Sequence, residues 1–141
     1  DIEENSKNLE FIEIEAAALA AERRTDDQAA GLLATIELMA KAETPEDFAR
    51  HDLDFHKTVA DASNNPFMAS ISALVEMALT AAFTISSPVN EPEALTQTVA
   101  VHRAIADAIS ERDAIAAREA MRVAIAEGFA RAAGRMEERK N

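Results

Sequence analysis

Residues 44–63 read TPEDFARHDLDFHKTVADAS, and this stretch decides the fold class. Thr44 can cap a helix, Pro45 suits the first helical position, and the two acids that follow favour a helix N-terminus. Further on, apolar side chains recur at helical spacing and mark one face for burial in a core. These apolar residues are Phe48, Phe55 and Val59. The stretch therefore predicts an amphipathic helix, which ends near Asn64 and Asn65.

Similar signals on both sides of this stretch predict five further helices. Residues 25–28 (TDDQ) match a capping box, Pro66 can open another helix, and Asp113 can cap the last one. Short connections between consecutive helices favour antiparallel neighbours. The expected helices cover about Ser6–Arg24, Thr25–Ala42, Thr44–Asn64, Pro66–Ser86, Glu93–Ser110 and Asp113 onward, with the last one fraying over residues 137–140.

The composition agrees with an all-α fold in a single domain, 1–141. Apolar residues make up 48% of the chain, aromatic residues only 4%, and there are three Gly and four Pro. Strong helix formers are abundant and β-branched runs are scarce. The chain begins almost directly in a helix, so we expect it to be part of something longer.

The charge of the chain excludes some partners. It carries 14 basic and 26 acidic residues, a net charge of −12, whereas a protein that neutralises DNA phosphates needs a basic surface. This segment is therefore not expected to bind DNA or an anionic membrane. The polar N-terminus resembles no signal peptide, and there is no Cys. We expect a cytoplasmic protein.

Three polar residues lie where apolar ones belong. Asp52 and His56 are four residues apart on the apolar face of the central helix, and His102 lies on a similar stripe with Val99 and Ile109. A buried Asp is costly unless it is paired or bound to a metal, and carboxylate and imidazole suit Zn²⁺, Ni²⁺, Mn²⁺ or Fe²⁺. The alternative is an Asp52–His56 pair beside a hydrogen-bonded core histidine. Spacing alone favours this alternative, because Asp-x-x-x-His pairs are common on helices.

Patterns typical of enzymes are missing from the sequence. There are no Glu-x-x-His pairs, which di-metal carboxylate bundles need, and no Gly-rich phosphate loop or G-x-S-x-G motif. His51 lies outside the apolar stripe and is expected to be solvated. We therefore expect no enzyme, although a small metal-dependent enzyme remains an alternative, since three protein ligands leave a position open.

Several segments, in order and at matching spacings, resemble the FCD domain. This is the C-terminal effector-binding domain of the FadR subfamily of GntR-type bacterial transcription regulators. The resemblance covers nearly the whole chain. It rests on residues 15–23 (EAAALAAER), 52–56 (DLDFH), 62–66 (ASNNP), 102–109 (HRAIADAI), 112–113 (RD) and 120–122 (AMR).

The resemblance implies an antiparallel bundle of six to seven helices that binds a small organic acid and helps the regulator to form a homodimer. In many members a divalent metal ion is held by one Asp and three His. Asp52, His56 and His102 match three of these positions, and Ala124 occupies the fourth, which leaves room for water or the effector. Only the resemblance suggests that Ser63 and Asn65 line the same pocket.

A second departure from the family pattern concerns the effector. Many members carry Arg-x-x-x-Glu in the first helix, and Leu9 stands where the Arg would precede Glu13. The usual sugar-acid ligand is therefore less strongly implied. Two further alternatives are a metal-free domain of the same fold that binds a larger or apolar ligand, and a purely structural bundle. The resemblance also implies that DNA is contacted only through an N-terminal winged-helix domain, which this chain lacks.

Overall fold

The computed structural model describes residues 2–85 and 87–140, and it describes the helix side chains except those of 2–6, 75, 78–85, 135–136 and 139–140. Over these ranges the chain forms six α-helices and no strand, as predicted. The helix α6 remains helical to Lys140 instead of fraying, because Glu, Arg and Lys are good helix formers. The expected helix end at Ser86 lies outside the described residues. The helices are α1 (Ile2–Arg23), α2 (Asp26–Ala40), α3 (Pro45–Ala62), α4 (Pro66–Ile85), α5 (Pro92–Ser110) and α6 (Ala114–Lys140).

The predicted caps are present at three helix starts. Thr25 and Gln28 form a reciprocal capping box at α2, with distances of 3.1 Å and 2.9 Å between side-chain oxygen and backbone nitrogen. The Thr44 hydroxyl accepts from the Asp47 amide at 3.1 Å at the start of α3. Asp113 accepts from a backbone amide at 3.0 Å and caps α6. These local bonds explain why the helix starts could be predicted from the sequence.

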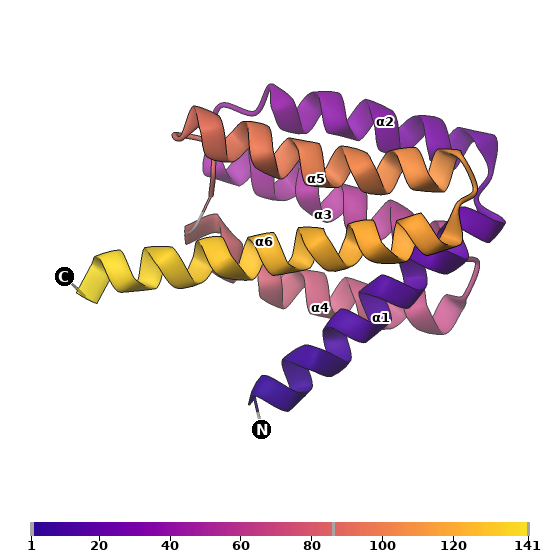
Figure 1. The fold of residues 1–141 in the computed structure, drawn as a ribbon, viewed down its shortest axis with the longest axis horizontal. Helices are drawn as coiled ribbons and strands as arrows, with labels where there is room; N and C mark the ends of the chain where they lie inside the picture. The colour runs from indigo at the N-terminus through magenta and orange to yellow at the C-terminus, as the bar shows by residue number, and fades with distance from the viewer. Residues whose placement is uncertain (1, 86, 141) are drawn as a thin grey trace.

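The helices α2 to α6 alternate in direction, and α1 crosses them at a steep angle (Figure 1). The helices α5 and α6 run side by side in opposite directions, and α1 packs against α3, α4, α5 and α6. Arg24 donates to the carbonyl oxygens of Ile109 at 3.3 Å and Ser110 at 2.7 Å. Arg112, in the next turn, donates to the Glu22 carbonyl at 3.2 Å. The end of α1 is thereby fastened to the end of α5.

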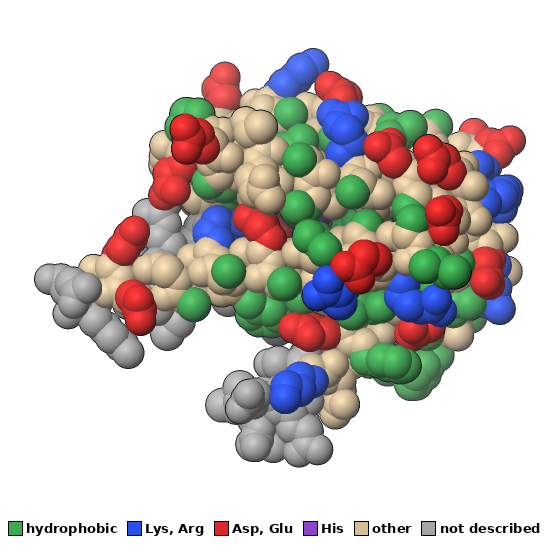
Figure 2. Space-filling model, viewed as in Figure 1, with side chains coloured by type: hydrophobic (Ala, Val, Ile, Leu, Met, Phe, Trp, Pro, Cys, Tyr) green, Lys and Arg blue, Asp and Glu red, His purple; other side chains and the backbone are tan. Residues whose placement is uncertain are grey.

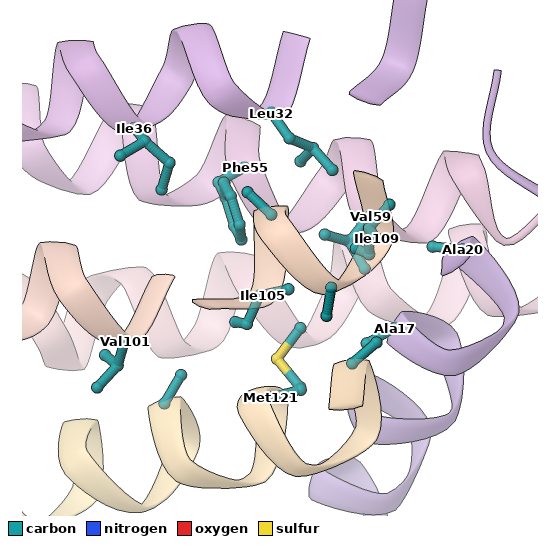
Figure 3. Packing of buried hydrophobic residues seen from close by; sticks show 14 of the residues in the cluster. Ala17, Ala20, Leu32, Ile36, Phe55, Val59, Val101, Ile105, Ile109 and Met121 are labelled. Atoms are coloured by element: carbon teal, nitrogen blue, oxygen red, sulfur yellow. The ribbon is translucent and has the colours of Figure 1, made fainter. Parts of the chain in front are cut away.

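The core lies between α2, α3, α5 and α6, and α1 closes it with small side chains (Figure 3). Ala17 and Ala20 of α1 are fully buried and let α1 approach the other helices closely. Burying each Leu, Ile or Phe side chain completely contributes about 1.5–3 kcal/mol to the stability of the fold. This apolar layer therefore offsets the cost of burying the polar site beside it. The largest fully buried side chains include Leu32, Ile36, Met39, Phe55, Val59, Ile105, Ile109 and Met121.

The visible surface is mixed in charge. On the face shown in Figure 2, Lys and Arg side chains are scattered among Asp and Glu, and no continuous basic surface crosses it. Among the described residues, every helix is too short or too polar to cross a bilayer.

Candidate functional site

The structure brings Asp52, His56 and His102 together. Asp52 Oδ1 lies 2.9 Å from His102 Nε2, which comes from α5, and 3.1 Å from His56 Nε2, one turn further along α3. The three ligand atoms lie within 4.8 Å of one another. Asp52 is the most exposed of the three, with 18% of its side chain accessible, and both imidazoles are buried. Two helices thus supply one carboxylate and two imidazoles to a common point.

The orientation of the His102 ring is set by a backbone oxygen. His102 Nδ1 lies 2.8 Å from the Thr98 carbonyl oxygen, which can only accept a hydrogen bond. Nδ1 therefore carries a proton, and Nε2 faces the Asp52 carboxylate at 2.9 Å. Phe55 lies edge-on to both imidazoles, with ring centroids 5.3 Å from His102 and 5.7 Å from His56. This fully buried ring restricts how far either imidazole can turn.

The other side of His56 faces two buried carboxylates, which the sequence analysis missed. His56 Nδ1 lies 3.5 Å from Glu13 Oε2 of α1 and 3.6 Å from Glu76 Oε1 of α4. Glu13 Oε1 accepts from the Ser72 hydroxyl at 2.6 Å. Glu13 Oε2 and His56 Nδ1 have no hydrogen-bond partner and are inaccessible to solvent. We call Glu13, His56 and Glu76 the acidic triad.

Burial and mutual charge shift the protonation of this cluster. Burial alone would raise the pKa of Asp52, but the two imidazoles outweigh it and hold that pKa well below its ordinary value. Burial alone would lower the pKa of His56, yet the charges of Glu76 and Asp52 raise it well above 6.5. Burial raises the pKa of Glu76 to about 7, and the Glu13 charge adds to this effect. The protonation states of Asp52, His56 and Glu76 therefore depend on one another.

A pocket of about 60 Å³ opens onto both groups of residues. Ala124 and Leu9, the positions at which this chain departs from the family pattern, both line it. Near the pocket wall, Arg131 donates to Glu127 Oε1 at 2.7 Å and to the Thr98 hydroxyl at 3.1 Å. The pocket lining thus includes the Asp52–His56–His102 group, the carboxylates of Glu13 and Glu76, and the Arg131–Glu127 pair.

Ser63 and Asn65 lie elsewhere, in the turn between α3 and α4. The Ser63 hydroxyl donates to the Ala60 carbonyl oxygen, and the Asn65 side chain accepts from the Phe67 amide at 3.1 Å. Neither residue is among those that line the pocket. His51 is half-buried and belongs to neither the Asp52 group nor the acidic triad.

The sequence does contain a signal for each missed carboxylate. Glu76 is the only charged residue in the 20 residues of α4, so its side chain had to be either paired or functional. Glu13 lies three, four and seven residues before Ala16, Ala17 and Ala20, on the stripe of α1 that is buried. Neither signal shows that the two helices bring these carboxylates to the same imidazole.

The family model of the FCD domain matches residues 9–127, most of the chain. The chain belongs to the FCD domain family. FCD domains are the effector-binding domains of GntR-type transcription regulators, and the matched range includes every residue of both His56-containing clusters. No curated protein matches the sequence.

Proposed function

We propose that this FCD domain senses a small organic acid in a FadR-type regulator, through a divalent metal ion bound by Asp52, His56 and His102. The observation that carries the proposal is the orientation of the two imidazoles. Both turn Nε2 toward Asp52 Oδ1, and both turn Nδ1 toward an acceptor. Metal-bound histidines ordinarily donate their second N–H to a carboxylate or carbonyl group in this way.

The donor set suits Zn²⁺, Ni²⁺, Mn²⁺ or Fe²⁺, and a bound ion would offer a coordination position to the carboxylate of an effector. Ala124 supplies no donor atom although it lines the pocket, so water or the effector has to complete the shell. The role of the chain's own residues is to hold the ring orientations and to shield the site. The Thr98 carbonyl oxygen orients His102, Phe55 packs against both rings, and Glu13 and Glu76 face His56 Nδ1.

Dimerisation is the second part of the proposal, and its partner is a second copy of this chain. Three large apolar side chains on α4 are mostly exposed to solvent: Phe67 at 70%, Leu74 at 71% and Met77 at 69%. Such a cluster is unusual on a helix that remains in water. The family's regulators act on DNA through a separate domain, so a dimer of this domain would place two such domains together for a two-fold operator.

The test of the metal site is the metal content of protein purified without a chelator or a His-tag, measured by elemental analysis. We expect close to one divalent ion per chain in the wild type and a large loss in Asp52→Asn, His56→Ala and His102→Ala. His51→Ala is the matched control, because it removes an imidazole outside the site, and it should retain the metal. Unchanged metal content in His56→Ala would mean that the cluster is structural.

A further inference from the structure

One wall of the pocket is apolar and is built by residues of α1 and α6. We propose that the effector is a short monocarboxylate with an apolar chain, which packs against Leu9, Ile125 and Phe129 while its carboxylate completes the shell of the metal ion. Dicarboxylates and acids with a polar far end are then poor ligands. This inference rests on the effector-binding function proposed above and narrows the class of acid that the site takes.

The first argument is the chemistry of this wall. Most of the surface that the pocket presents is apolar, and Leu9, Ile125 and Phe129 all line it. The carboxylates of the acidic triad add little polar surface, because the side chains of Glu13 and Glu76 are only 4% and 6% exposed. A hydrocarbon chain placed against such a wall leaves water together with the wall itself, which favours binding.

The second argument is the size of the pocket. Ala124 and Gly128 of α6 are four residues apart, so they lie on the same face of the helix, and both line the pocket. Neither has a side chain larger than a methyl group, which leaves space between the helices. The volume of about 60 Å³ has room for roughly four to six water molecules. An unbranched acid of about two to four carbon atoms fits this volume.

The third argument is the absence of a partner for a second carboxylate. Among the described residues that line the pocket, Arg131 is the only one with a permanent positive charge. It already donates to Glu127 Oε1 at 2.7 Å and to the Thr98 hydroxyl at 3.1 Å. The imidazoles bind a metal ion in their neutral form. A carboxylate at the far end of the effector would therefore lose its hydration without gaining a cation, which is costly.

The experiment titrates two series of acids into the metal-loaded protein by calorimetry. In the first series, acetate, propionate and butyrate differ by one methylene group each. We expect affinity to rise about four-fold for each methylene that is fully buried, and about ten-fold from acetate to butyrate. In the second series, the terminal methyl group of butyrate becomes CH₂OH in 4-hydroxybutyrate and a carboxylate in succinate. Both should bind at least about five-fold more weakly than butyrate, since each places a polar group against the apolar wall.

Leu9→Asn tests whether the wall makes this selection. The substitution keeps a side chain of similar length and replaces its apolar end by an amide. The gain in affinity from acetate to butyrate should then fall to about three-fold, because part of the buried hydrocarbon contact is lost. Leu38→Asn is the matched control, since it makes the same change at a half-exposed leucine of α2 outside the pocket, and it should keep the wild-type gain. Circular dichroism shows that each variant is folded.

The outcomes separate the inference from the proposed function. Equal binding of acetate and butyrate by the wild type, or binding of succinate as tight as that of butyrate, would overturn the inference and leave the proposed function standing. An unchanged gain in folded Leu9→Asn would overturn it as well, because the chain of the acid would then lie away from Leu9. Failure of every acid to bind would overturn the inference and the proposed organic-acid effector together.

Discussion

Replacing Glu76 by Gln should stabilise the metal-free protein at alkaline pH. Burial raises the pKa of Glu76 from 4.5 to about 7, so the folded state holds a proton that the unfolded chain gives up more readily. Stability is therefore lost as the pH rises from about 4.5 to about 7, and the full cost is present above that window. Each pKa unit corresponds to about 1.4 kcal/mol. The free energy of unfolding that is lost because of the buried Glu76 carboxylate approaches about 3 kcal/mol at pH 8 and is under about 1 kcal/mol at pH 5.

The measurement is urea unfolding at pH 5 and pH 8, in the presence of a chelator. Gln resembles protonated Glu in shape. Glu76→Gln should therefore have a free energy of unfolding higher than that of the wild type by most of this amount at pH 8, and by little at pH 5. Glu43→Gln, on the surface, should change stability by less than about 0.5 kcal/mol at either pH. Destabilisation of Glu76→Gln at pH 8 would refute the reasoning. It would mean that the attraction between the Glu76 carboxylate and His56 outweighs the cost of burying the charge.

Three further predictions concern the metal and the dimer. Ala124→His should add a fourth donor and raise metal affinity at least about ten-fold in competition with a chelator; unchanged affinity would show that position 124 does not reach the ion. Metal affinity should weaken as the pH falls from 8 to 6, because the raised pKa of His56 makes protons stronger competitors for its ring. Calorimetry in buffers of different ionisation enthalpy should accordingly detect proton release, and a pH-independent affinity would contradict this. Leu74→Glu should weaken self-association at least about ten-fold in analytical ultracentrifugation, whereas a wild type that stays monomeric would remove the dimer proposal.

The helices and part of the site could be predicted from local patterns in the sequence. Caps such as Thr25 and Thr44 act within one turn, so the pattern of nearby residues contains the information that starts a helix. Asp52 and His56 lie on the same helix face for an equally local reason, since four residues make about one turn. The inward direction of His102 also followed from the apolar residues around it, and the structure confirms its burial.

Which helices meet at the site depends on how the whole bundle packs. Glu13 and Glu76 are 63 residues apart in the chain, and each approaches His56 because α1 crosses the bundle and α4 packs beside α3. The crossing of α1 depends on the volumes of many side chains, among them the small buried alanines of α1, and no local pattern specifies it. Ser63 and Asn65 illustrate the same limit, because their side chains cap helix ends away from the pocket. Side-chain periodicity predicts whether a residue faces inward, but the partner that it meets there depends on how the helices pack.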